Sequence, residues 1–323
     1  MPKPRSAQIV LNETPYYHLV SRCVRRAFLC GVTETFDFGH RRKWISERRE
    51  FLSKIFAIDT AAFAFMSNHY HLVVRVDAER ANNWTQLEVI ARWRLLFRIH
   101  PLVEQSLSDT EFCPSRLHIV NNIVENWRKR LTDISWFMRC LNEHIARLAN
   151  LEDQCTGRFW EGRFKSQALL DMRAVFTGMV YVDLNPIRAN QADTPETSEH
   201  TTIQQRLGKA VHCALHGTLL PFSDQLCAQE NRPFLPYTFT DYVELVEWTG
   251  RHIRSQHKGA MSKDAPPILA RLGINTAAWL RNCQQLETDF HQVIGPLSAV
   301  KHFCKSIGQQ WLQGQGACQR SFG

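Results

Sequence analysis

The stretch Ala61-Ala-Phe-Ala-Phe-Met-Ser-Asn-His-Tyr-His-Leu-Val-Val-Arg-Val-Asp77 is the most informative part of the chain. Its aromatic and β-branched residues predict a β-strand over residues 61–77. Because side chains alternate across a strand, His69 and His71 are expected on one face, together with Arg75. Tyr70 is expected on the other face, in the core.

Two imidazoles on one strand face can bind one divalent metal ion, because neutral histidine is a common ligand for such ions. The same pattern also fits two half-buried histidines that are hydrogen-bonded to neighbouring groups. The His-x-His spacing alone does not separate these alternatives. Arg75, on the histidine face, is a candidate contact for a nucleic-acid phosphate.

The segments on either side alternate between strand and helix patterns. The clearest helix covers residues 134–150, where an apolar stripe that includes Ile145 follows the i, i+3, i+4 spacing. A strand is expected over residues 15–25 and a loop over residues 102–117. Further helices are expected over residues 41–58, 86–99, 118–130 and 171–182, the last ended by Asn185-Pro186, with short proline-broken helices over residues 201–323.

The overall composition is that of an ordinary globular protein with a basic surface. The chain has 323 residues, enough for two domains, and its net charge of +8 favours an anionic partner such as nucleic acid. No apolar run approaches the roughly 18 residues of a membrane-spanning helix, and no signal-peptide pattern follows Met1. The ten cysteines form no C-x-x-C pair. They are expected to be reduced thiols, so the sequence predicts a cytoplasmic protein without a membrane partner.

Four blocks of sequence, taken together in their order, carry a resemblance to a known family. They are His18-Leu-Val-Ser-Arg22, Phe65-Met-Ser-Asn-His-Tyr-His-Leu72, Gly157-Arg-Phe-Trp-Glu-Gly-Arg-Phe-Lys-Ser166 and Tyr181-Val-Asp-Leu-Asn-Pro-Ile-Arg-Ala189. Over residues of about 10–195, the chain resembles the REP-associated tyrosine transposases, within the single-tyrosine HUH endonuclease superfamily. The part from about residue 200 shows no such resemblance.

The resemblance implies an α+β fold, with a small antiparallel, ferredoxin-like sheet flanked by helices in residues 1–195. A helical insert is expected at about 78–132, and residues 196–323 are expected to form a mainly helical C-terminal extension. In this family two histidines, here His69 and His71, hold Mg²⁺ or Mn²⁺ together with a polar residue from a later helix. A helix tyrosine attacks a phosphate of single-stranded hairpin DNA, and the strand is then rejoined elsewhere in transposition.

This chain lacks the family tyrosine at its expected place. That tyrosine usually lies about a dozen residues before the glycine of the third block, and here the position is occupied by Ile145. The sequence leaves three alternatives: another tyrosine attacks the DNA, a metal-bound water cleaves it, or the protein binds DNA without cleaving it. The tyrosines to consider as replacements are Tyr181, Tyr16, Tyr17 and Tyr242.

The resemblance also places a third metal ligand on the helix of residues 134–150. Asn142 is the nearest amide to Ile145 on a helical wheel, which makes it the candidate ligand. Glu143 and His144 have better ligand chemistry but lie further round the helix. Glu143 is also expected to form an ion pair with Arg147, four residues later.

The third block combines basic and aromatic residues, which suits nucleic acid. Arg158, Arg163 and Lys165 are expected to contact phosphates, and Trp160 can stack on an unpaired base. The aromatic side chains of this block can equally anchor the loop on the core. A second candidate DNA patch lies at the end of the first strand and consists of Arg22, Arg25 and Arg26.

The insert at about 78–132 carries basic helix faces, which suit an extended DNA surface, a dimer contact or simple solvation. The sequence does not decide between a monomer and a homodimer.

Overall fold

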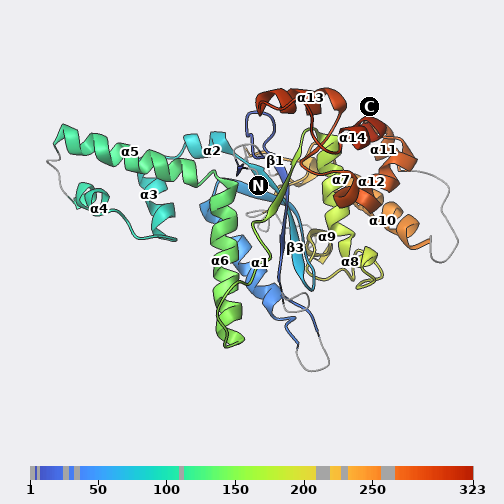
Figure 1. The fold of residues 1–323 in the computed structure, drawn as a ribbon, viewed down its shortest axis with the longest axis horizontal. Helices are drawn as coiled ribbons and strands as arrows, with labels where there is room; N and C mark the ends of the chain where they lie inside the picture. Colours follow the sequence, from blue (N-terminus) through green and yellow to red (C-terminus); the bar gives the residue numbers. More distant parts are fainter. Residues whose placement is uncertain are drawn as a thin grey trace.

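A five-stranded sheet with helices on both faces forms the centre of the protein (Figure 1). The computed structural model describes residues 4–5, 8–24, 29–32, 37–108, 113–208, 219–226, 232–255 and 266–322. The strand order is β2-β3-β1-β4-β5, with antiparallel neighbours except for the parallel pair β4–β5. The strands are β1 (Tyr16–Arg22), β2 (Ile58–Phe65), β3 (His69–Val76), β4 (Lys165–Leu169) and β5 (Val293–Ile294). The α+β class expected from the sequence is therefore confirmed.

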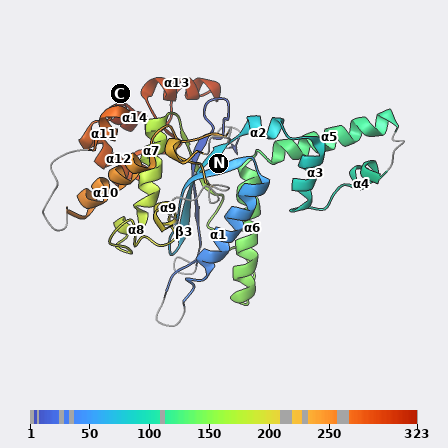
Figure 2. The same ribbon diagram turned by 180° about the vertical axis from the view of Figure 1, so that it is seen from behind.

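Helices α1 (Arg41–Ile55) and α6 (Ile134–Glu152) lie on one face of the sheet, and α7 (Met172–Asp183) and α12 (Thr276–Asp289) lie on the other (Figure 1). Figure 2 shows the same separation from behind. The residues beyond α7 add helices on the α7 side. These are α8 (Asn185–Arg188), α9 (Thr202–Gly208), α10 (Phe239–Ser255), α11 (Pro267–Leu272), α13 (Leu297–Ser306) and α14 (Gln315–Phe322).

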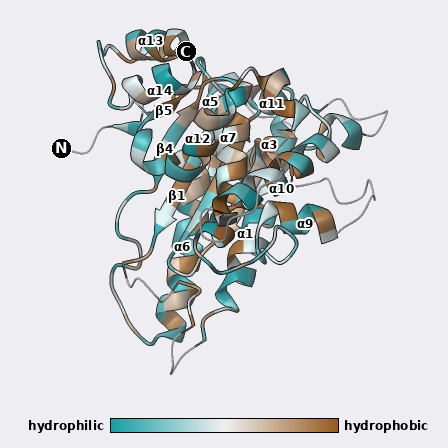
Figure 3. Cartoon of the chain, turned by 90° about the vertical axis from the view of Figure 1, so that its right-hand side faces the viewer, coloured by the Kyte–Doolittle hydropathy of each residue, from teal (hydrophilic) through white to brown (hydrophobic). Residues whose placement is uncertain are grey.

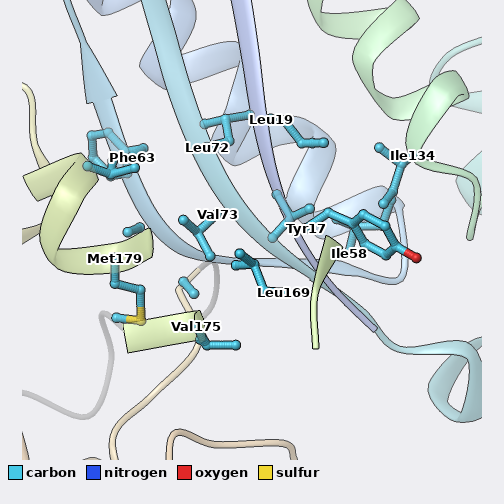
Figure 4. Packing of buried hydrophobic residues seen from close by; sticks show 14 of the residues in the cluster. Tyr17, Leu19, Ile58, Phe63, Leu72, Val73, Ile134, Leu169, Val175 and Met179 are labelled. Carbon is cyan, nitrogen blue, oxygen red and sulfur yellow. The ribbon is translucent and has the colours of Figure 1, made fainter. Parts of the chain in front are cut away.

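Helix α6 forms where its apolar stripe predicts it. Asp133 caps the first turn by accepting hydrogen bonds from the backbone N–H groups of Ser135 and Trp136. The apolar side of the helix, including Ile145, is buried. In Figure 4, Ile134 of this helix lies beside Tyr17 of β1, on the α6 side of the core.

Helix α7 is apolar nearly all round, because it is covered on several sides. Residues Ala174–Asp183 are all buried, and Figure 3 colours the helix largely as hydrophobic. Gly178 lies against the side chains of Val73 and Leu169, so the lack of a side chain lets α7 approach the sheet closely. This contact fixes α7 on the face of β3 that carries Val73.

The single strand expected over residues 61–77 is wrong, because the chain turns back within it. Strands β2 and β3 form an antiparallel hairpin, and Met66 N–H donates to the carbonyl of His69 across the turn, at 2.9 Å. Ser67 and Asn68 occupy the turn, and both residue types favour turns by hydrogen bonding to the nearby backbone. His69 is consequently the first residue of β3.

Two further expectations are corrected. Residues 102–117, expected as a loop, contain most of α4 (Pro101–Ser108) and the start of α5 (Pro114–Arg130), whose proline occupies the first turn. The pair Asn185-Pro186 does not simply end a helix, since it starts the short helix α8. Helices α4 and α5, with α2 (Ala78–Asn82) and α3 (Gln86–Arg94), form an arm that extends away from the sheet (Figure 1).

The C-terminal residues join the sheet directly. Strand β5, which the sequence did not indicate, pairs with β4 through Ala168 and Leu169. On the α7 side, the Asp183 carboxylate accepts hydrogen bonds from the Tyr242 hydroxyl at 2.6 Å and from the Ile203 N–H at 3.0 Å.

In the described ranges, no helix is both long and apolar enough to cross a membrane.

Candidate nucleic-acid interface and histidine cluster

Three histidines lie together on the α7 face of the sheet. Strands β1 and β3 pair so that Val20 stands opposite His71 and Arg22 opposite His69. His18 lies two residues before Val20 on β1 and therefore on the same face of the sheet. Its ring stacks on that of His71, with ring centroids 5.2 Å apart and an interplanar angle of 8°. The rings of His69 and His71 are 4.8 Å apart and nearly perpendicular. The structure therefore brings His69 and His71 together as their spacing predicts, and it places Arg22 beside them.

The histidine rings are connected by short hydrogen bonds. His18 Nε2 lies 2.9 Å from His71 Nδ1, and His18 Nδ1 lies 2.7 Å from Oε1 of Gln167 on β4. His69 Nδ1 contacts the side-chain oxygen of Asn68 in the hairpin turn. These contacts fix the orientation of each ring.

Burial keeps these imidazoles neutral. The pKa of His71 lies well below its ordinary value because the ring is buried and stands beside His18 and His69. Burial likewise lowers the pKa of His18. It lowers the pKa of His69 to about 4, with a further contribution from the Arg22 guanidinium. At neutral pH each ring thus has one nitrogen that carries a hydrogen and one that carries a lone pair.

Three side chains from later parts of the chain cover the histidine cluster. The ring of Tyr181 on α7 lies 5.9 Å from that of His71 and 6.0 Å from that of His18. The Arg188 guanidinium stands 3.5 Å above the Tyr181 ring and donates to the Cys283 carbonyl. Glu287 Oε1, from α12, lies 3.6 Å from His71 Nδ1. The pKa of Tyr181 is raised to about 12, mainly by burial.

The histidine pair does not complete a metal site. The Nε2 atom of His71 is buried and has no hydrogen-bond partner within the described ranges, which fits a nitrogen that binds a metal ion. However, among the residues that the structure describes, no three His, Cys, Asp or Glu side chains are grouped to hold a metal ion. The described part of the chain thus supplies two imidazoles without the further protein ligands of a closed site.

A pocket of about 570 Å³ opens beside the histidine cluster. Its lining combines His18 and Glu287 with basic side chains from three separate segments. Arg158, Arg163 and Lys165 of the third sequence block are exposed, whereas Phe159, Trp160 and Phe164 of the same block are buried. The basic residues that line the pocket are Arg5, Arg158, Arg163, Lys165 and His291.

The aromatic residues of this block anchor the loop. The Trp160 indole N–H donates to the backbone carbonyl of Asn142 at 2.9 Å, and its ring packs edge-on against Tyr70. Arg5 from the N-terminal segment stands 3.7 Å above the Phe164 ring. Trp160 is therefore a core residue, and its predicted role in stacking on a base does not agree with its position.

Two predicted residues lie on the wrong face of the sheet. Asn142 on α6 accepts a hydrogen bond from the Tyr70 hydroxyl and donates to Ser21 Oγ at 3.0 Å. Both partners alternate with the histidine-face residues of their strands, so the sheet separates Asn142 from His69 and His71. The buried Ile145 stands on the same helix. Neither a third ligand at Asn142 nor a nucleophile at position 145 would reach the histidines.

Arg75, another predicted site residue, is likewise distant from the cluster. Arg75 stands opposite Tyr16 of β1. It follows His71 by four residues on β3, which places it about 13 Å further along the strand. It forms an ion pair with Asp77 at 3.4 Å. Arg25 and Arg26 lie outside the described residues.

Of the four tyrosines considered as replacements, Tyr181 is the one beside the histidines. The Tyr242 hydroxyl is bonded to Asp183, and the Tyr17 hydroxyl accepts the Val10 N–H on the α6 face. Tyr16 stands at the far end of β1, opposite Arg75.

Sequence reasoning missed several residues of this site. His18 could have been found, because it lies on the same strand face as Arg22 and alternation predicts that they point together. Gln167 and Glu287 gave no local signal. They reach the cluster through the β1–β4 pairing and through the packing of α12 on α7.

Comparisons with known proteins give one distant likeness. No family model matches the chain, and no curated protein matches it. Among solved structures, it is similar to a REP-associated tyrosine transposase bound to a REP hairpin, with 10% sequence identity and a TM-score of 0.39. The match covers 66% of this chain and 88% of that one.

Proposed function

We propose that this protein binds single-stranded, hairpin-forming DNA in the basic pocket beside the histidine cluster. The main support for this proposal is that Arg158, Arg163 and Lys165 line one pocket with His18, together with Arg5. The resemblance in four sequence blocks supports a transposase-type relative with a ferredoxin-like core in residues 1–195. The strand order β2-β3-β1-β4 with antiparallel neighbours is consistent with that core.

The physical basis of the proposal is the alternation of anchored and exposed residues in the loop. Buried Phe159, Trp160 and Phe164 hold the backbone, and the basic side chains between them extend into solvent. Guanidinium and ammonium groups held in this way can contact successive phosphates without first ordering the loop. The net charge of +8 adds a long-range attraction for the same partner.

A salt titration tests this proposal. A labelled hairpin oligonucleotide with a single-stranded flank is titrated with protein, and binding is followed by fluorescence anisotropy at several salt concentrations. Replacing Arg158, Arg163 and Lys165 by Ala removes three phosphate contacts, which should flatten the slope of log K against log [salt] by about 2.

The matched control removes the same charge elsewhere. Lys43, Lys54 and Lys305 are exposed and lie on α1 and α13, so their triple Ala variant should leave the slope nearly unchanged. Equal effects of the two triple variants would indicate non-specific attraction and contradict the pocket as the DNA site.

A second candidate function is metal-dependent DNA cleavage with rejoining, and the position of Tyr181 against His18 and His71 favours it. In this reaction the phenol oxygen bonds to the phosphorus, and the neighbouring 3′ oxygen leaves and takes up a proton. The phenol proton must pass to a base. His69 and His71 would supply two ligands to a bound Mg²⁺ or Mn²⁺ ion. A cytoplasmic location is part of the same proposal.

A further inference from the structure

The side-chain amide of Gln167 has a determined orientation. Its Nε2 lies 2.7 Å from the backbone carbonyl of Phe290, and a carbonyl oxygen only accepts hydrogen bonds. The amide nitrogen must therefore face Phe290, which leaves Oε1 facing His18 Nδ1 at 2.7 Å. This backbone partner removes the usual ambiguity between the oxygen and nitrogen of a glutamine side chain.

The orientation of Gln167 then determines the proton on each imidazole. Oε1 is an acceptor, so His18 Nδ1 carries the hydrogen, and Nε2 of the neutral His18 ring is an acceptor. That atom lies 2.9 Å from His71 Nδ1, which must consequently be the donor. The remaining nitrogen of His71, Nε2, carries the lone pair, and it is buried without a hydrogen-bond partner in the described part of the chain.

We propose that Gln167 and His18 are positioning residues that hold His71 as its Nδ1–H tautomer and so present the Nε2 lone pair to a divalent cation or a hydrogen-bond donor. The inference concerns the histidine site of the proposed function. Its anchor is the carbonyl of Phe290, between α12 and β5, so residues beyond 196 determine the chemical state of a histidine on the central sheet.

Other contacts of His71 agree with this assignment. Glu287 Oε1, which can only accept when ionised, lies 3.6 Å from the same Nδ1 atom. The opposite tautomer would direct the lone pairs of His18 Nε2 and His71 Nδ1 at each other. It would also leave a buried N–H of His71 without an acceptor among the described residues.

Nuclear magnetic resonance of the full-length protein tests the proposal without DNA or metal. Histidine labelled with ¹⁵N distinguishes protonated from unprotonated ring nitrogens, and a His71→Gln variant assigns the His71 signals. The expected result is one tautomer of His71, with the hydrogen on Nδ1. A hydrogen on Nε2 of His71 in the unmodified protein would overturn the proposal even if the Gln167 variants failed to fold.

The variants separate positioning from general packing. Gln167→Leu removes the acceptor for His18, so His71 should change from one tautomer to comparable populations of two. Gln167→Glu keeps an acceptor and should retain the Nδ1–H form. Ser166→Ala, on the neighbouring residue, should have no effect. An unchanged His71 tautomer in a folded Gln167→Leu variant would contradict the proposal, whereas a loss of DNA binding alone would bear only on the proposed function.

Discussion

The hydroxyl of Tyr70 donates a hydrogen bond to the side-chain oxygen of Asn142, on the face of the sheet opposite to His71. Tyr70 and His71 are consecutive residues of β3, so their side chains point to opposite faces. Helix α6, on which the sequence resemblance places the nucleophile position, therefore packs on the side away from the histidines. Helix α7, with Tyr181, occupies the histidine face.

The first prediction concerns Ile145→Tyr. The new phenol would enter the apolar core on the α6 face, so it should form no covalent link with DNA, and the free energy of unfolding should fall by about 1–3 kcal/mol. Denaturant unfolding measures the loss, and a denaturing gel with labelled hairpin DNA and Mn²⁺ measures any covalent complex. A covalent complex present in this variant and absent from the unmodified protein would place α6 against the histidines.

The second prediction concerns Tyr181. If the protein cleaves and rejoins DNA, a protein-linked DNA band should form, and Tyr181→Phe should remove it while leaving hairpin affinity within about twofold. Tyr242→Phe is the matched control, because that hydroxyl is bonded to Asp183 away from the histidines.

The outcomes of this experiment distinguish the alternatives left by the sequence. Free cleaved ends without a protein-linked band would indicate a water-using nuclease. Binding without cleavage would agree with the raised pKa of Tyr181, about 12, which opposes formation of the reactive phenolate.

The sequence predicted the helices and strands better than it predicted which face of the sheet each helix covers. The stripe from Ile134 onward identified α6, and alternation put His69 and His71 on one strand face. It did not reveal the turn at Ser67-Asn68, because that turn contains neither Gly nor Pro and lies within a continuous β-type pattern. A helical stripe also does not say which face of a sheet the helix covers. For that reason Ile145 and Asn142 were expected beside the wrong residues.

The residues that complete the histidine site were beyond sequence reasoning for a different reason. Gln167 and Glu287 belong to β4 and α12, far from His71 in sequence, and only the sheet pairing and helix packing bring them close. The third sequence block, residues 157–166, was easier to predict, because its exposed and buried residues alternate by chemical type. Its charges were expected at the surface, and Arg158, Arg163 and Lys165 are exposed.

The third prediction concerns metal binding. Because His69 and His71 supply two ligands and the described residues complete no site, Mn²⁺ should stabilise the free protein weakly. A DNA phosphate adds oxygen ligands, so Mn²⁺ and hairpin DNA together should raise the melting temperature by more than the sum of their separate effects. His69→Ala and His71→Ala should each remove this extra shift, as should a chelator. Thermal unfolding measures it, and an extra shift retained in both variants would place the metal elsewhere.

The last prediction concerns Asp183, the buried carboxyl group that joins α7 to α10 through the Tyr242 hydroxyl. Burial raises its pKa from 3.8 to about 6, so the folded protein binds a proton more tightly than the unfolded chain does. Stability should therefore fall as the pH rises from about 4 to about 6, by an amount on the order of 3 kcal/mol, and the loss should be complete above that range. Asp183→Asn keeps an acceptor for the Ile203 N–H without a charge, so it should abolish this decline in denaturant unfolding curves. Glu196→Gln, at an exposed position, should leave the decline intact. A decline that persists in Asp183→Asn would mean that another buried group titrates in this range.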